Sequence, residues 1–366
     1  LELAMDSPDG VAQRDLLASA HESAEALLTL LNDILDFSKI EADQLELEAI
    51  GFNLRTTVEG VADAHAQRAE AKGLELICSI AEDCPTYVRG DPGRLRQVMV
   101  NLVGNAIKFT DSGEVVIRVE SESESDTHTV VRFSVSDTGI GIPADRQQAL
   151  FQRFVQGDGS TTRRYGGTGL GLAISSDLIK MMGGTIELES VPGRGSTFWF
   201  AVPIEKQAVP EAMPLATPDE LDGLRVLVAD DNATGRTILS RMLDTLGCEV
   251  GAAGSGTQAV ELIQSAARAG HPYRVAFLDM QMPGMDGEAT AQAINHNPLT
   301  RDTILVLLTS VGKRGDAARM EALGFAGYLL KPIKLQLLHE ELLAVLGLKT
   351  DESPALITRH VLSEQR

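Results

Sequence analysis

The chain has 366 residues, with 32 Lys or Arg against 52 Asp or Glu, so its formal net charge is −20. This length predicts more than one domain. The negative balance argues against a nucleic-acid-binding surface, which requires clustered basic side chains. No stretch reaches the ~18 apolar residues that span a bilayer, and no signal-peptide pattern opens the chain. We therefore expect a cytoplasmic location, with any membrane-bound sensor domain outside this chain.

The first segment, residues 1–48, has a helical pattern interrupted by the breaker "SPDG". From Val11 to about Glu48, apolar residues recur at alternating spacings of four and three. The resulting apolar stripe is broad, as in a helix that belongs to a bundle. We expect a helical hairpin with a shortened first arm, which dimerises into a four-helix bundle.

Residues 49–205 mix helical and strand patterns. The segments "EVVIRVESE" and "HTVVRFSVSD" alternate as strands do, and the acidic residues 121–126 between them predict a solvated hairpin tip. The segment "GGTIELESVPGRGSTFWFAVP" predicts a second hairpin. This domain is expected to be an α+β sandwich with its helices packed on one sheet.

Residues 206–222 are rich in Pro, Glu and Ala and predict a linker. In residues 223–348, strand and helix patterns alternate regularly, and the five short strands are continuously apolar. Such runs are typical of strands buried on both faces, so we expect a doubly wound, five-stranded parallel sheet. Residues 349–366 form an irregular tail that resembles a linker to a further receiver.

Three glycine-containing stretches and one asparagine-containing stretch together predict a nucleotide site: "DTGIGI", "GGTGLGLAI", "PGRGSTF" and "NLVGNAIKFT". Asn101 and Asn105 are four residues apart, so a helix places both amides on one face, where a carbonyl oxygen can ligate Mg²⁺. Asp137 ends a strand, and a buried carboxylate there can accept a hydrogen bond from the amine of adenine.

The glycines of "GGTGLGLAI" precede a predicted helix, whose free backbone amides suit phosphates. The polar segment "QGDGSTTRRY" before it is expected to form a mobile lid. Arg163 and Arg164 in that segment are equally well explained as phosphate contacts or as solvated surface charges.

These stretches resemble the asparagine and glycine boxes of the histidine-kinase catalytic domain, which has the Bergerat ATP-binding fold. "LFQRFVQ" resembles its phenylalanine box, although Phe154 is better explained by core packing, and "LLNDILDFSKIEA" resembles the end of its dimerisation helix. The resemblance implies ATP and Mg²⁺ as cofactors, with Asn105 as the metal ligand. It implies nucleotide contacts from Asn101, Asn105, Lys108, Asp137, Gly139, Gly141, Gly167, Thr168, Gly169, Leu170 and Gly171.

Polar residues follow the strands of the third domain: Asp230 and Asp231 after the first, Asp279 after the third, Thr309 after the fourth and Lys331 after the fifth. The carboxyl ends of parallel strands meet at one edge of the sheet. Carboxylates gathered there repel one another and require a hard cation such as Mg²⁺. One carboxylate can then act as a nucleophile and form an acyl phosphate. Acids simply exposed in loops would leave the matching lysine and hydroxyl unexplained.

The segments "VADDN", "LDMQMPGMDG" and "LLKP" resemble a response-regulator receiver domain over residues 224–347. The resemblance implies Asp279 as the phosphoacceptor, with Lys331 and Thr309 as catalytic partners. It implies Mg²⁺ ligands from Asp230, Asp231, Asp279 and the carbonyl of Gln281. Thr309 and Tyr328 match the family's switch positions, although Tyr328 is equally well explained as a core aromatic.

His21 is followed by Glu22, as in the phosphoacceptor motif His-Glu-x-Arg-Thr-Pro-Leu-Asn, but the arginine and proline are absent. His21 also falls on the apolar stripe. We therefore expect it to be a structural helix residue, with the acceptor histidine upstream of Leu1, and His360 to be a linker residue.

Together these patterns predict part of a hybrid sensor histidine kinase that passes a phosphoryl group from ATP to a histidine and then to Asp279. This chain is expected to bind ATP without autophosphorylating. Its expected partners are a second copy, through the N-terminal helices, and a downstream histidine-phosphotransfer protein or response regulator. The alternative is a non-catalytic, nucleotide-binding dimeric scaffold with a phosphorylatable receiver. An ATPase of the same fold that acts as a chaperone or on DNA is disfavoured by the receiver and the charge.

Overall fold

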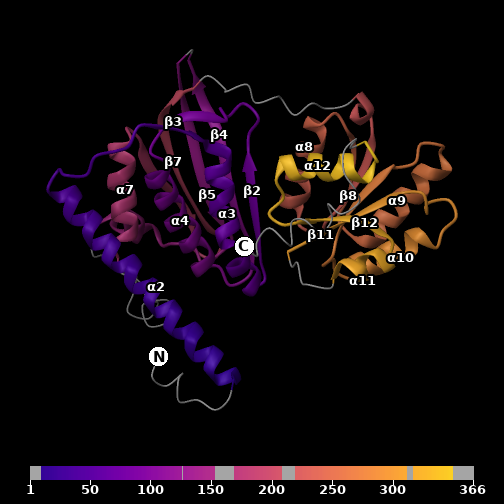
Figure 1. Ribbon diagram of the computed structural model, residues 1–366, viewed down its shortest axis with the longest axis horizontal. Helices are drawn as coiled ribbons and strands as arrows, with labels where there is room; N and C mark the ends of the chain where they lie inside the picture. Colours follow the sequence, from indigo (N-terminus) through magenta and orange to yellow (C-terminus); the bar gives the residue numbers. More distant parts are fainter. Residues whose placement is uncertain (1–9, 126, 153–168, 208–218, 311–315, 349–366) are drawn as a thin grey trace. The chain divides into compact units, whose positions relative to one another are not determined.

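In the computed structural model (Figure 1), the structure describes residues 10–125, 127–152, 169–207, 219–310 and 316–348. They form two compact units, one around a seven-stranded sheet and one around a parallel five-stranded sheet. The predicted combination of an α+β sandwich and a doubly wound sheet is confirmed. Within these ranges, every helix is too short or too polar to cross a lipid bilayer.

The described elements before the predicted linker are a long first helix and then strands of one sheet with helices between some of them. Their bounds are α2 (Gly10–Glu41), β1 (Ile50–Asn53), α3 (Leu54–Ala71), β2 (Leu74–Ile80), β3 (Tyr87–Gly90), α4 (Pro92–Phe109), β4 (Gly113–Glu124), β5 (His128–Asp137), α5 (Ala144–Gln147), the 3₁₀ helix η1 (Gln148–Phe151), α7 (Gly171–Met181), β6 (Thr185–Val191) and β7 (Gly195–Lys206). The strand order is β1-β3-β7-β5-β4-β2, with β6 paired to β7.

Helix α2 ends at Glu41, earlier than the boundary near Glu48 that the sequence pattern predicts. The backbone N–H of Gln44 donates to the carbonyl of Lys39, and Asp43 takes a positive φ of 52°, a conformation that stops a helix. Leu45 is then buried in the first unit, so the apolar residue that seemed to extend the helix belongs to the core. The first arm of the predicted hairpin would fall in residues 1–9, outside the described residues, and the bundle stays a prediction.

The large sheet buries one face and leaves the other partly solvated. Along β5 and β7 burial alternates residue by residue, as expected for antiparallel strands with one core face. Phe133 and Phe200 lie on that core face and stack with their ring centroids 4.9 Å apart. The predicted β6–β7 hairpin is confirmed. Strand β4 continues through Glu124, so the acidic tip is shorter than residues 121–126, and Lys206 still belongs to β7 rather than to the linker.

Helix α4 is the element of the first unit on which the predicted site depends. Asp91 caps its N-terminus by accepting a hydrogen bond from the backbone N–H of Arg94, and Pro92 takes the first helical position. One face of the helix is buried, including Leu95, Val98, Met99, Leu102, Val103, Ala106 and Ile107. This packing fixes α4 in rotation about its own axis and therefore fixes where its asparagines lie.

The second unit alternates strands and helices as predicted. Its elements are the 3₁₀ helix η2 (Asp219–Leu221), β8 (Arg225–Ala229), α8 (Ala233–Thr245), β9 (Glu249–Ala253), α9 (Gly256–Arg268), β10 (Val275–Asp279), α10 (Gly287–Asn295), β11 (Ile304–Thr309), α11 (Asp316–Ala322), β12 (Phe325–Leu330) and α12 (Leu335–Val345). The strand order is β12-β11-β10-β8-β9, and each neighbouring pair is parallel. Separate cores cover the two sheet faces, which explains why β10 is buried along its whole length.

Candidate functional site

The two asparagines of α4 lie one helical turn apart and are joined by a hydrogen bond. Asn105 Nδ2 donates to Asn101 Oδ1 over 3.2 Å, and Asn101 Nδ2 donates to the hydroxyl of Ser175 on α7 over 2.9 Å. The pairing fixes both amides in one orientation. With its NH₂ group turned toward Asn101, the carbonyl oxygen of Asn105 points away from Asn101. This oxygen is the atom that a cation would require.

Helix α7 begins against this pair of amides. A Cβ built on Gly171 would lie 2.6 Å from Asn101 Oδ1, so a larger residue there would displace the Asn101 amide. Gly169 has a positive φ of 70°, and Leu170 between them is buried. The glycines at positions 169 and 171 are therefore explained by backbone conformation and by close helix packing, which also bring the free backbone amides of α7 beside the asparagines.

Asp137 ends β5, as predicted, and its carboxylate turns back onto the following loop. Its Oδ1 accepts the backbone N–H of Gly139 over 2.8 Å. Burial raises the pKa of Asp137 above its ordinary value, although hydrogen bonds from the backbone N–H groups of Gly139 and Ser196 act in the opposite direction. A ligand that donates a hydrogen bond to this carboxylate would offset part of its lost hydration.

Two glycine stretches that are far apart in sequence meet beside Asp137. A Cβ on Gly195 would lie 1.8 Å from the carbonyl oxygen of Asp137, and one on Gly141 would lie 2.1 Å from that of Val191. Both glycines have positive φ, 98° and 65° respectively. The "DTGIGI" and "PGRGSTF" stretches thus form one tightly packed wall.

This wall is connected to the asparagines through the end of α4. The backbone N–H of Ile140 donates to the carbonyl of Phe109, and a Cβ on Gly139 would lie 2.4 Å from that same oxygen. Phe109 is the last residue of α4, two turns beyond Asn101. The structure therefore gathers Asn101, Asn105, Asp137 and Gly171 around one helix, and we refer to these four residues as the asparagine–glycine site.

Several residues of the predicted nucleotide site lie outside the described residues: Arg163, Arg164, Gly167, Thr168 and Phe154. Phe151 is described and packs edge to face against Phe198, which agrees with a role in packing. Lys108 lies in the last turn of α4, with its ammonium 5.0 Å from the ring centroid of the neighbouring Phe109.

At the edge of the five-stranded sheet, carboxylate oxygens of Asp230, Asp231 and Asp279 all lie within 4.8 Å of one another. Asp230 and Asp279 are buried, whereas Asp231 is exposed. Three acids this close fit a hard cation, which prefers oxygen ligands and offsets their mutual repulsion. The acidic residues at the carboxyl ends of the strands thus lie together, as the sequence predicts.

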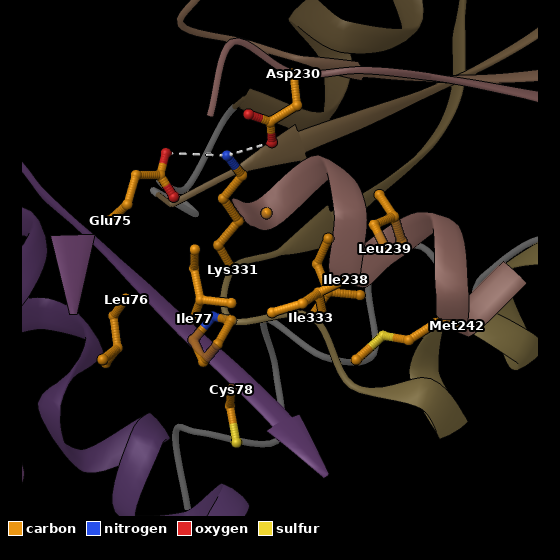
Figure 2. Close-up of a pocket in the computed structure, with 12 residues that line it drawn as sticks. Glu75, Leu76, Ile77, Cys78, Asp230, Ile238, Leu239, Met242, Lys331 and Ile333 are labelled. Carbon is orange, nitrogen blue, oxygen red and sulfur yellow. Dashed lines mark hydrogen bonds and ion pairs between the residues drawn. The ribbon is translucent and has the colours of Figure 1, made fainter. Parts of the chain in front are cut away.

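Lys331 is the counter-charge of this cluster. Its Nζ lies 3.0 Å from Asp230 Oδ2 and 3.1 Å from Asp279 Oδ2. Figure 2 marks the contact with Asp230 by a dashed line. Burial acts to lower the pKa of Lys331, but the charges of Asp279 and Asp230 outweigh it and leave that pKa above its ordinary value. Burial raises the pKa of Asp279 to about 6, with Lys331 opposing the shift and Asp230 adding to it. Asp230, Asp231, Asp279 and Lys331 are named the carboxylate site below.

Local backbone contacts hold this site together. The backbone N–H of Lys331 donates to the carbonyl of Thr309, so the ends of β11 and β12 are joined. Asn232 caps α8, and its own N–H donates to Asp230 Oδ1. A Cβ on Gly287, at the start of α10, would lie 2.6 Å from the carbonyl oxygen of Asp279, so glycine permits this close approach.

The remaining predicted residues lie around the same edge. Thr309 is half-buried at the end of β11, and Gln281 is exposed just after Asp279. Tyr328 is partly buried against one core of the unit, and burial, followed by the charge of Glu341, raises its pKa. The carbonyl ligand and switch roles of these residues stay predictions.

Sequence reasoning missed the residues that support the asparagine–glycine site. Ser175 contacts Asn101, and the hydroxyl of Thr110 lies 2.9 Å from a Cβ built on Gly139. Ser175 is 2% exposed, although serine is usually a surface residue. The sequence could have indicated this role, because Ser175 is a polar residue one turn after Gly171 on the buried face of an apolar helix.

Comparison with known families divides the chain in the same way. Residues 90–206 match the family described as histidine kinase-, DNA gyrase B-, and HSP90-like ATPase. Residues 226–343 match the response regulator receiver domain.

Individual proteins are similar over longer stretches. The sensor histidine kinase AruS of Pseudomonas aeruginosa is 35% identical over 366 residues, which cover 100% of this chain and 36% of AruS. The sensor protein GacS of Pseudomonas syringae is 45% identical over 237 residues, covering 65% of this chain and 26% of GacS. The crystal structure of full-length ShkA in complex with AMPPNP superposes with a TM-score of 0.72 at 31% identity, covering 96% of this chain and 68% of that one.

The chain thus spans only about a third of AruS and about a quarter of GacS. The matched families occur in the order found in the sequence, ATPase first and receiver second. With relatives that are sensor histidine kinases at both the sequence and the structural level, the chain belongs to the hybrid sensor histidine kinases.

Proposed function

We propose that this chain binds Mg²⁺-ATP at the asparagine–glycine site, supports transfer of the γ-phosphoryl group to a histidine of a dimerisation helix, and then receives that group on Asp279. The observation that supports this most directly is that one chain contains both a site of amides and glycines with one carboxylate and a site of three carboxylates with a lysine. The asparagine–glycine site suits ATP, a phosphoryl donor that brings its own negative charge. The second suits a phosphoryl acceptor.

At the first site, Asn105 would hold Mg²⁺ through its carbonyl oxygen, and Asp137 would accept a hydrogen bond from the adenine amine. The backbone amides at the start of α7 would contact phosphates. Bound Mg²⁺ would neutralise charge on the phosphate oxygens. The remaining work of this domain is positioning, because phosphoryl transfer depends mainly on alignment and charge stabilisation.

At the second site, Asp230, Asp231 and Asp279, with the Gln281 carbonyl, would hold Mg²⁺. A carboxylate oxygen of Asp279 forms a P–O bond as the P–N bond of phosphohistidine breaks, and the departing imidazole takes up a proton. Lys331 and the Thr309 hydroxyl would bind the oxygens of the transferred group. The product is an acyl phosphate on Asp279.

We propose that His21 is not the phosphoacceptor of this reaction. The residues after it depart from the acceptor motif, because Arg, Thr and Pro are replaced by other residues. We also propose that α2 mediates a homodimer. Among its described side chains, seven large apolar ones are exposed in the single chain: Leu17, Leu27, Leu28, Leu30, Leu31, Ile34 and Leu35. Sedimentation should show a dimer that Leu28→Glu weakens.

The proposal is tested with two phosphoryl donors. Calorimetry should detect ATP binding that requires Mg²⁺, and labelled acetyl phosphate should label wild type but not Asp279→Asn. Labelled ATP alone should leave no acid-labile label on the chain. Acid-labile label that disappears in His21→Gln would overturn the assignment of His21, and acetyl phosphate labelling of Asp279→Asn would overturn that of Asp279. Absence of ATP binding would overturn the kinase proposal.

A further inference from the structure

The two asparagines of α4 and the serine of α7 form a hydrogen-bonded row with a direction. The Asn105 amide group donates to Asn101, and the Asn101 amide group donates to Ser175. Ser175 is buried, with 2% of its surface exposed, and it lies one turn after Gly171 on α7. Asn101 of α4 therefore faces two positions one turn apart on α7, Gly171 and Ser175.

The direction of this row matters because the two ends of an amide are chemically different. A carbonyl oxygen can ligate a cation, whereas an amide NH₂ group is a donor only and repels it. If the row were reversed, Asn105 would donate outward and present NH₂ where the metal ligand is required. The direction of these hydrogen bonds therefore decides whether the Asn105 amide presents its oxygen to a metal.

The start of α7 selects the observed direction, and Ser175 holds it. Asn101 Oδ1 lies beside Gly171, the first residue of the helix, where unpaired backbone N–H groups give a partial positive charge that favours an oxygen over NH₂. The hydroxyl of Ser175 then accepts from the other end of the same amide. Because a serine hydroxyl can donate as well as accept, Ser175 does not choose the direction, but its described contact holds the Asn101 amide in place once the direction is set.

We propose that Ser175 is a positioning residue for metal-dependent nucleotide binding, acting through Asn101 on the orientation of the Asn105 amide. The inference rests on the proposed function, in which Asn105 is a Mg²⁺ ligand. Ser175 itself would touch neither metal nor nucleotide. Loss of its hydroxyl would leave Asn101 Nδ2 without its acceptor and allow both amides to rotate.

The experiment compares the affinity of the full chain for ATP with Mg²⁺ and with EDTA. Ser175→Ala should weaken Mg²⁺-ATP binding by roughly tenfold, as is typical for residues that orient a metal ligand, and leave ATP binding in EDTA unchanged. Ser175→Thr keeps the hydroxyl and should restore most of the affinity. The neighbouring buried Ser176 provides the matched control, since Ser176→Ala should change neither value.

The outcomes separate the inference from the proposed function. Equal weakening with and without Mg²⁺ in Ser175→Ala, or no weakening, would overturn the inference, because the hydroxyl would then act through the fold or not at all. If Asn105→Ala itself leaves Mg²⁺-ATP binding unchanged, the proposed function fails instead. The unfolding midpoint of each variant shows whether it folds, and failure of Ser175→Thr to restore binding in a folded chain would also count against the role of the hydroxyl.

Discussion

In the asparagine–glycine site of the first unit the facing side chains are mostly neutral amides, whereas in the carboxylate site of the second unit they are three acids and a lysine. The first site is built by close backbone approach at glycines, and the second by charges that balance one another. A nucleotide brings its own negative charge, so a sterically defined site with a single carboxylate suits it. A phosphoryl acceptor must supply the nucleophile, so its site contains the charge.

This contrast predicts that added side-chain volume destabilises the asparagine–glycine site, whereas the protonation of Asp279 affects the carboxylate site. In a protein with a formal net charge of −20, gathering more acids is costly unless a counter-charge is present. Lys331 supplies that counter-charge in the carboxylate site. No comparable ion pair is described between the residues that define the asparagine–glycine site.

The largest effect is expected from a methyl group at Gly195. Gly195→Ala places Cβ 1.8 Å from the carbonyl oxygen of Asp137 at a φ of 98°, and should lower the free energy of unfolding of the first unit by about 3 kcal/mol. Urea denaturation followed by the fluorescence of Trp199, in β7, measures it. Gly193→Ala is the matched control, because its Cβ meets nothing within 4 Å, and it should cost about 1 kcal/mol for its positive φ alone. Equal losses would show that close packing does not define this wall.

A smaller effect is expected from the titration of Asp279. Burial raises its pKa from 3.8 to about 6, so the folded state binds this proton more tightly than the unfolded chain. Its contribution to stability is therefore full below about pH 4 and is lost as the pH rises through about 6. In EDTA, wild type should lose about 2 kcal/mol relative to Asp279→Asn between those pH values.

Unfolding of the second unit in urea at a series of pH values measures this difference. The control is Asp302→Asn, since the side chain of Asp302 is 91% exposed and lies outside the carboxylate site. A constant difference between wild type and Asp279→Asn would contradict the burial argument.

The smallest effect is expected for the ion pair of Asp36 and Arg94, which lies outside the asparagine–glycine site. Asp36 of α2 accepts hydrogen bonds from Arg94 and Gln97 of α4, both over 2.8 Å, and is itself buried. A double-mutant cycle of Asp36→Ala and Arg94→Ala should give a coupling energy of about 1 kcal/mol. The pair of Arg89 and Glu205, which is about half exposed and 3.9 Å apart, should give almost none. A larger value for the exposed pair would show that burial does not set the strength of these contacts.

Apolar runs were sufficient to predict the strands of the second unit, and the inner strand β10 is buried throughout as such a run suggests, whereas the edge strands β9 and β12 are partly exposed. Periodicity failed at the end of α2, where Leu45 follows the apolar pattern but is buried after the helix has stopped. An apolar residue satisfies the same pattern whether a helix continues or the chain turns into a core. Local sequence alone does not distinguish these outcomes.

The sequence by itself determined which chemical groups this protein has for handling phosphate: two amides a turn apart, acids at strand ends, a lysine and the glycines between them. Only the tertiary structure decided how those groups are oriented. The Ser175 contact with Asn101, and the glycine Cβ positions that would meet carbonyl oxygens, join segments far apart in the chain. Such contacts depend on the relative positions of whole helices and strands, which follow from packing of the core and leave no local pattern in the sequence.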